Sequence, residues 1–196
     1  MKSKVVPETL WIVDKIHSEI GFKVKHLMIA SLKGSFRQFD AVITTVGKDF
    51  TRAQIQVTIE ADSIHTGDRE RDEHLTSLDF LDVQNYRHIL FKSKKIIKTQ
   101  QKDQFLVFGD LTMLGVNRPI ELAVQFGGIL LDPWGNEKAG FQVCGKINRL
   151  DWGLTWNTIL KTGGLLIGES VTILGEFELI NATQRAKVRG QEYMLR

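Results

Sequence analysis

Residues 53–62, AQIQVTIEAD, are the clearest indication of how this chain folds. Apolar and polar side chains occupy alternate positions, with Ile55, Val57, Ile59 and Ala61 in one set and Gln54, Gln56, Thr58 and Glu60 in the other. Successive side chains of a β-strand point to opposite faces of the sheet. The stretch therefore predicts a strand with one buried face and one face in water.

The same alternation recurs along most of the chain. About nine strands are predicted, near residues 9–14, 19–26, 34–46, 52–61, 88–97, 104–114, 119–130, 140–148 and 170–180. Short turn signals, such as those at residues 100–103 and 132–135, separate several of them. Long strands, short turns and few helices favour an antiparallel barrel or sandwich.

Length and composition restrict the class of protein. The 196 residues suit one domain, which we place at residues 1–180, followed by a polar tail at 181–196. A net charge of +3 without a basic stretch interleaved with aromatics gives no support for nucleic acid binding. No apolar run reaches the roughly 18 residues of a membrane span. The lone Cys144 and the N-terminus, which lacks a secretory signal, predict a cytoplasmic protein.

The charged run at residues 66–80, TGDRERDEHLTSLDF, interrupts the alternation. It predicts a short helix near residues 68–79, with Thr66 or Asp68 as its N-cap. On this interpretation Leu75, Leu78 and Phe80 face the barrel while the charges face water. The alternative is an acid–base pair of Glu70 and His74, but no GxSxG element supports a hydrolase. We therefore favour a solvated helix with i, i+4 pairs such as Arg69–Glu73.

Two further patterns give little support for a metal or nucleotide site. None of the five histidines forms an HxH, HxxxH or HExxH pair, so structural or surface roles and no metal site are expected. The segments GGLLIG (163–168) and FGGIL (126–130) lack the lysine and the spacing of nucleotide-binding loops. Glycines at these places predict bulges or bends in barrel strands.

Several strands are apolar on both faces, as in FLVFGDLTML (105–114). A strand that lines a dry cavity needs this composition, and so does a strand covered on its outer side. Eight-stranded barrels are of the size that either fills with side chains or holds one small ligand. Composition leaves both interpretations open.

The ordered motifs along the chain resemble one known family. They are Trp11-x-x-Asp14-x-x-His17-Ser18, Phe22, His26 and Gly34-x-Phe36; SIHTGDRERDEHL (63–75) with Asp79, Phe80 and Phe91; Gly109-x-Leu111-Thr112 and Gly115-x-x-Arg118-Pro119; and Arg149-x-Asp151-Trp152-Gly153. Over residues 10 to about 180 they are similar to the YceI-like, lipocalin-like polyisoprenoid-binding proteins. His88 stands where that family usually has proline.

The resemblance implies an extended antiparallel barrel of about eight strands around an apolar tunnel. Its expected activity is non-enzymatic binding of a long-chain lipid such as an isoprenoid quinone, a polyprenyl phosphate or a fatty-acyl derivative, with a role in transport and no cofactor. The implied ligand-binding residues are Phe22, Val24, Ile55, Val57, Ile59, Phe91, Val107 and Leu111, with Arg71 and His74 at the tunnel end.

Three questions stay open at this point. One alternative is an enzyme that acts on such a lipid through Arg71, Asp72 and His74, and another is a stress-related interaction module with a filled barrel. A homodimer is an open alternative for the assembly. The polar motif residues also have structural explanations: Asp14, His17 and Ser18 can form an Asx-type turn, and Arg118 and Arg149 can bind strand-end carbonyls or pair with Asp110 and Asp151.

Overall fold

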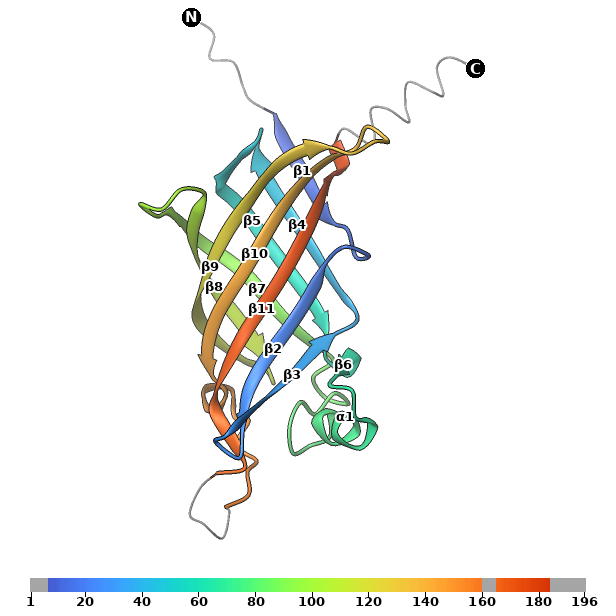
Figure 1. The fold of residues 1–196 in the computed structure, drawn as a ribbon, viewed down its shortest axis with the longest axis vertical. Helices are drawn as coiled ribbons and strands as arrows, with labels where there is room; N and C mark the ends of the chain where they lie inside the picture. Colours follow the sequence, from blue (N-terminus) through green and yellow to red (C-terminus); the bar gives the residue numbers. More distant parts are fainter. Residues whose placement is uncertain (1–6, 160–164, 184–196) are drawn as a thin grey trace, which may run out of the picture.

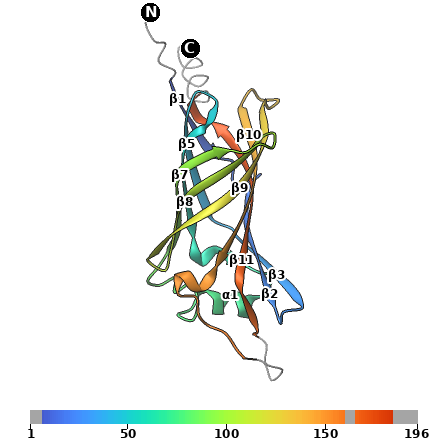
Figure 2. The ribbon, with the colours of Figure 1, turned by 90° about the vertical axis from the view of Figure 1, so that its left-hand side faces the viewer.

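The computed structural model describes residues 7–159 and 165–183, which form an elongated antiparallel β-barrel (Figures 1 and 2). The strands are β1 (Glu8–Val13), β2 (Glu19–His26), β3 (Ala30–Phe36), β4 (Phe39–Val46), β5 (Asp49–Glu60), β6 (Ile64–His65), β7 (His88–Lys98), β8 (Gln104–Met113), β9 (Val116–Leu131), β10 (Glu137–Asn148) and β11 (Ile167–Asn181). The helix α1 spans Arg69–Thr76, and the 3₁₀ helices η1 (Ala61–Ser63) and η2 (Arg149–Trp152) follow β5 and β10. The predicted all-β class with one short helix is confirmed.

The barrel closes because the last strand pairs with the first. Within the described residues the sheet order is β1-β4-β5-β7-β8-β9-β10-β11, and β1 pairs back to β11. β2 continues along the same edge of β11, and β3 and β6 follow it in the sheet. The pairs β1/β2, β3/β4 and β5/β6 thus each act as two halves of one barrel strand, which gives the eight antiparallel positions that were predicted.

The bend between β1 and β2 is held by side chains instead of strand pairing. Asp14 Oδ1 accepts the backbone N–H of Ile16 (3.2 Å), and Asp14 Oδ2 lies 3.1 Å from His17 Nδ1. Ser18 Oγ accepts the backbone N–H of Glu178 on β11 (2.9 Å). The Asx-type turn predicted for these residues is confirmed.

The single strand predicted at residues 34–46 is wrong. The chain instead forms β3 and β4 on either side of Arg37 and Gln38. The backbone N–H groups of these two residues donate to the backbone oxygen and the hydroxyl of Ser63, each at 3.0 Å. The sequence carries a signal of this break, because the cavity-facing Phe36 and the buried Phe39 lie three residues apart and so change the parity of the alternation.

The helix α1 begins as predicted but ends early. Asp68 is its N-cap, and its Oδ1 accepts the N–H of Arg71 (2.9 Å). The helix stops at Thr76 because Ser77 is extended and its hydroxyl donates to the carbonyl of His74. Leu78 is consequently 80% exposed, so the prediction that it faces the barrel is wrong, whereas Phe80 is buried.

Glycine and arginine serve the fold at several of the positions that were singled out, whereas Gly163 and Gly164 of the predicted GGLLIG bend lie outside the described residues. The β9–β10 register shifts next to Gly140, opposite Gly127 and Gly128, and Gly128 has a φ of 114°, so FGGIL forms a bulge. Arg118 donates to the carbonyl of Asp151, and the buried Arg149 donates to the carbonyls of Gly168 and Leu154. Of the two predicted alternatives, the structure shows the bonds to backbone carbonyls.

The barrel extends one residue beyond the predicted domain end. Asn181 pairs with Trp11, and its side chain donates to Glu137 (2.7 Å). Most of the predicted tail at 181–196 lies outside the described residues, from residue 184 onward. Among the residues that the structure describes, no helix has the length and apolar character needed to cross a membrane.

Candidate functional site

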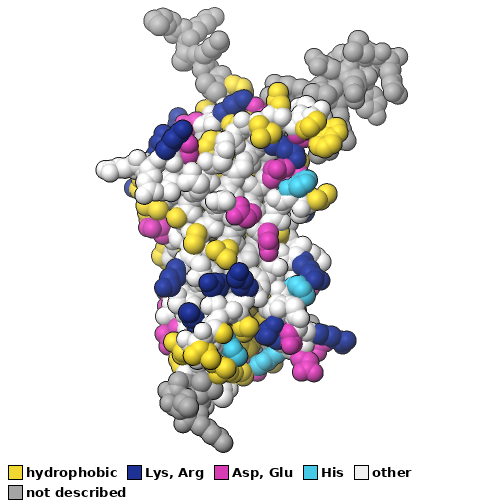
Figure 3. Space-filling model, in the orientation of Figure 1, with side chains coloured by type: hydrophobic (Ala, Val, Ile, Leu, Met, Phe, Trp, Pro, Cys, Tyr) yellow, Lys and Arg dark blue, Asp and Glu magenta, His cyan; other side chains and the backbone are white. Residues whose placement is uncertain are grey.

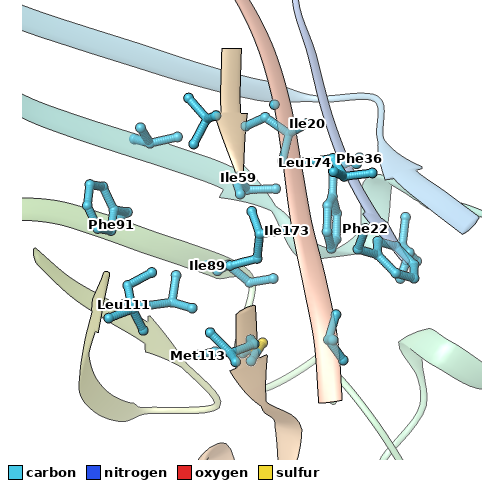
Figure 4. A pocket seen from close by; sticks show the side chains of 18 of the residues that line it. Ile20, Phe22, Phe36, Ile59, Ile89, Phe91, Leu111, Met113, Ile173 and Leu174 are labelled. Carbon is cyan, nitrogen blue, oxygen red and sulfur yellow. The ribbon is translucent and has the colours of Figure 1, made fainter. Parts of the chain in front are cut away.

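The barrel encloses a cavity of about 730 Å³, which lies within the range of about 300–1,000 Å³ found for small-molecule sites. Aliphatic and aromatic side chains from opposite walls point into it. Figure 4 shows Ile59 of β5, Ile89 of β7 and Leu111 of β8 across the cavity from Ile20 of β2 and Ile173 of β11. The wall is therefore apolar along most of its length, as the inward set of each alternating strand dictates.

The ten residues that the resemblance implied all lie on this wall. Eight are apolar and two are polar: Phe22, Val24, Ile55, Val57, Ile59, Phe91, Val107, Leu111, Arg71 and His74. Their contact with a ligand stays a prediction. Residues that were missed, such as Phe36, Ile89 and Ile173, share the same inward alternation, which is the signal that could have found them.

Aromatic side chains close one end of the cavity. Trp11 is fully buried and packs on Phe50 with ring centroids 5.3 Å apart, while its indole N–H donates to Thr45 Oγ1 (3.0 Å). Phe50 in turn contacts Phe141 (4.9 Å) and Phe126 (5.6 Å). Phe50 and Phe141 also line the cavity, so this cluster is its floor.

Polar side chains gather at the opposite end. Asp68, Glu70, Arg71 and His74, all of α1 or its N-cap, border the cavity there, together with His26 at the end of β2. Asp68 and Glu70 are exposed, so the cavity meets solvent at this end. Figure 1 shows α1 at the same end of the barrel as the β2–β3 turn. We call this end the mouth.

Asp72 joins α1 to the strands beneath it. Its Oδ1 accepts the backbone N–H and the hydroxyl of Thr66 (2.9 and 2.5 Å), and its Oδ2 lies 3.1 Å from His65 Nδ1. Burial raises the pKa of Asp72, but the hydrogen bonds from Thr66 and His65 outweigh it and hold the pKa below its ordinary value. Arg71 also binds Thr66, through Nε to the hydroxyl (2.7 Å) and Nη2 to the carbonyl (3.0 Å).

His74 packs against two neighbouring aromatic rings at the mouth. Its ring packs edge-on against Phe80 and Trp156, with centroids 5.0 and 4.7 Å away, and its Nε2 lies 2.8 Å from Asp79 Oδ2. Within the described residues its partner is thus Asp79 and not Glu70, so the considered Glu70–His74 pair is wrong. The predicted Arg69–Glu73 pair is present at 2.8 Å.

Within the described residues, the hydrogen bonds of His74 run to a different partner from those of Arg71 and Asp72. Arg71 and Asp72 meet at Thr66, whereas His74 binds Asp79. A catalytic set needs its acid, base and nucleophile within hydrogen-bond reach of one another. The geometry can fix the helix and offer donors to a polar head group, and it does not assemble a catalytic triad from these three residues.

Another group of polar residues lies near the closed end, outside the cavity. Asp14, His17 and Glu178 bring their ligand atoms within 4.8 Å of one another, which is a spacing that a metal ion could use. The ammonium group of Lys138, however, donates to both carboxylates. Burial raises the pKa of Asp14, but bonds from His17, Lys138 and the N–H of Ile16 lower it to about 2. A cation of the protein itself therefore balances this cluster.

Comparison with known proteins agrees with the fold and the motifs. The family model of the YceI-like domain matches residues 11–179 of this chain. A UPF0312 protein of Staphylococcus epidermidis is 38% identical over 159 residues, covering 81% of this chain and 90% of the relative.

Solved structures show the same fold. The Campylobacter jejuni YceI protein is 31% identical with a TM-score of 0.67, over 86% of this chain and 96% of that one. A polyisoprenoid binding domain from Saccharophagus degradans has a TM-score of 0.63 at 16% identity, over 87% and 98% of the two chains. From its motifs, its closed barrel and these matches, the chain belongs to the YceI-like domain family.

Proposed function

We propose that this protein binds one long-chain amphiphile, with the hydrocarbon chain inside the barrel and the polar head at the mouth. The observation that carries the proposal is the cavity itself, which is apolar along its walls, shut by aromatic rings at one end and bordered by polar side chains at the other. Burial of a chain in such a site contributes about 0.8 kcal/mol per CH₂ group.

The mouth offers hydrogen-bond donors for the head group. A guanidinium has five N–H donors in total. Thr66 accepts from two nitrogens of Arg71, which orients the group without using all its donors. His74, held by Asp79 and 39% exposed, lies on the same wall. Head groups with oxygen acceptors, as in an isoprenoid quinone, a polyprenyl phosphate or a fatty-acyl derivative, fit this arrangement.

We further propose that binding takes place without turnover and that the role is transport of the lipid in the cytoplasm. The first point is supported by His74, which binds Asp79 and not the Thr66 at which Arg71 and Asp72 meet. The fold is shared with the Saccharophagus degradans domain, which is described as polyisoprenoid-binding. Burial of the chain in a pre-formed apolar cavity leaves few polar groups to satisfy, which suits a carrier.

The test is native mass spectrometry of the protein purified from its natural host, followed by lipid extraction. We expect one adduct per chain whose extract is a single class of long-chain amphiphile. The delipidated protein should take up a fluorescent long-chain lipid in competition with that extract. If the purified protein carries no lipid, and the delipidated protein takes up none, the proposal is wrong.

A further inference from the structure

We infer that the β2–β3 turn at the mouth docks on an anionic lipid bilayer. The turn consists of Leu27, Met28 and Ile29, which are 37%, 57% and 83% exposed. Ile159, 78% exposed, lies beside it: Ile159 bridges to Leu165, and the N–H of Leu27 donates to the carbonyl of Leu166 (2.8 Å). Three consecutive exposed apolar residues at the tip of a hairpin do not stabilise the fold in water, and such a patch marks an interaction site.

The backbone of the turn makes the choice of these residues more informative. Leu27 and Met28 have φ angles of 52° and 63°, and the N–H of Ile29 donates to the carbonyl of His26 (3.2 Å). His26 pairs with Ala30, so the loop has three residues, and its first two adopt the left-handed conformation that Gly and Asn accept most readily and that bulky side chains strain. Leucine and methionine thus stand at positions whose backbone conformation disfavours them, which points to a role for their exposed side chains.

Lysines flank the turn on the outer face of the hairpin. Lys23 on β2 pairs directly with Lys33 on β3, and Lys25 lies two residues closer to the turn on the same face. All three are exposed, and within the described part of the chain none of them has an ion-pair partner. Like charges directly opposite in a sheet are destabilising. An anionic surface would neutralise them, since clustered lysines beside an apolar segment are attracted to anionic lipids.

The turn lies beside the mouth, so a membrane bound to the turn would face the opening of the cavity. His26, Leu166 and Ile167 belong both to the neighbourhood of the turn and to the cavity wall, so the apolar tip continues into the mouth. Figure 3 shows hydrophobic side chains gathered at this end of the visible face, with Lys and Arg side chains above them. The acidic Glu70 and Glu73 of α1 are exposed across the mouth. The hairpin, and not the helix, is therefore the side that meets the membrane.

Docking in this way would place the mouth where a lipid can enter or leave without crossing water. The inference goes beyond the binding of a ligand in the barrel. Its measurement is also separate, because vesicle binding can be recorded whether or not the cavity holds a lipid. A loss of vesicle binding with unchanged lipid occupancy leaves the proposed function standing. A loss of lipid occupancy with unchanged vesicle binding leaves the membrane docking standing.

The experiment is co-sedimentation of the full chain with vesicles of phosphatidylcholine alone, or of equal parts phosphatidylcholine and phosphatidylglycerol. We expect binding to the anionic vesicles that weakens as salt is added, because salt screens exposed charges. The variant Leu27→Asn/Met28→Gly/Ile29→Thr keeps the turn conformation favourable and removes its apolar side chains. Its affinity for the anionic vesicles should fall by roughly tenfold or more. Lys23→Glu/Lys25→Glu/Lys33→Glu should lose the preference for anionic vesicles.

Two control variants match these changes elsewhere. Leu130→Ser/Leu131→Ser/Trp134→Ser removes the exposed apolar residues of the β9–β10 hairpin, at the closed end. Lys92→Glu/Lys95→Glu/Lys98→Glu makes the same charge change on exposed lysines of β7. Both controls should bind vesicles like the original protein.

Three results would overturn the inference. One is the absence of binding to anionic vesicles, and another is equal loss of binding in the turn variant and the β9–β10 control. The third is a turn variant that dissociates an oligomer in gel filtration while vesicle binding is unchanged, because the turn would then be a contact between copies of this chain.

Discussion

At one end of the barrel Trp11, Phe50 and Phe141 pack against one another and close the cavity, whereas at the other end Arg71 and His74 border an opening. Both ends are made by the same alternating strands, so the difference lies in what covers them. The closed end is held by ring contacts together with a few buried hydrogen bonds, such as those from Trp11 to Thr45 and from Asn181 to Glu137. The mouth is held by hydrogen bonds around Asp72 and Thr66. Stability should therefore depend more on the closed end, and access to the cavity more on the mouth.

The largest expected effect is at the closed end. Trp11→Ala should lower the free energy of unfolding by about 3–5 kcal/mol, because it removes a fully buried ring and leaves a void between Phe50 and Thr45. Urea unfolding followed by circular dichroism measures it. The matched control is Trp134→Ala, since Trp134 is 82% exposed and its loss should cost at most about 0.5 kcal/mol. Equal costs for the two tryptophans would contradict a closed end that carries the stability.

A smaller effect is expected at the mouth. Asp72→Ala removes the acceptor of the Thr66 N–H and hydroxyl and of the contact with His65, and it should cost about 1–3 kcal/mol. Lipid occupancy, measured by native mass spectrometry, should fall only as the fold loosens. If lipid is lost at an unchanged melting temperature, Asp72 acts on the ligand and not on the attachment of α1. Glu73→Ala, in the exposed pair with Arg69, is the control and should change stability by a few tenths of a kcal/mol.

The bend between β1 and β2 contacts β11, and we call this contact the seam. Its contribution to the stability of the folded protein should depend on pH. The pKa of Asp14 is lowered from 3.8 to about 2 in the folded protein, so its contribution to stability is complete above pH 3.8 and is lost as the pH falls through about 2. Asp14→Asn should cost about 1–2 kcal/mol near neutral pH. The difference from the original protein should shrink toward zero as the pH approaches 2, because a protonated Asp resembles Asn.

The control for this pH series is Asp40→Asn. Asp40 forms an exposed pair with Lys15, and such pairs contribute about 0–1 kcal/mol. A difference between Asp14→Asn and the original protein that stays constant from neutral pH to pH 2 would show that the carboxylate of Asp14 does not stabilise the seam.

The strands and the inward set could be predicted because alternation is a local property of the sequence. The alternation of Ile55, Val57 and Ile59 predicts both the strand and the face of it that lines the cavity. Whether that face is filled or hollow is not local, because it depends on how side chains from opposite walls, such as Leu111 and Ile173, meet across the barrel. For the same reason composition left a cavity and a packed core equally open.

The polar contacts at the mouth were harder to predict than the strands. Asp68 as N-cap and Arg69–Glu73 follow from helix geometry alone, and both are present. The pairing of His74 with Asp79 depends on where α1 ends, and the end depends on the extended conformation of Ser77. The break between β3 and β4 depends on Ser63, which lies 25 residues from Gln38 in the sequence. These contacts are tertiary, so their partners cannot be found from periodicity, although the changed parity between Phe36 and Phe39 marks where the strand breaks.

The central claim, that a lipid chain occupies the barrel, is tested most directly by filling the barrel. Val57 lines the cavity, whereas the preceding residue on β5, Gln56, is exposed on the outer face. We predict that Val57→Trp keeps the fold and loses the bound lipid in native mass spectrometry, while Gln56→Trp keeps both. Full lipid occupancy in Val57→Trp, with the tryptophan in place and the barrel folded, would contradict the account.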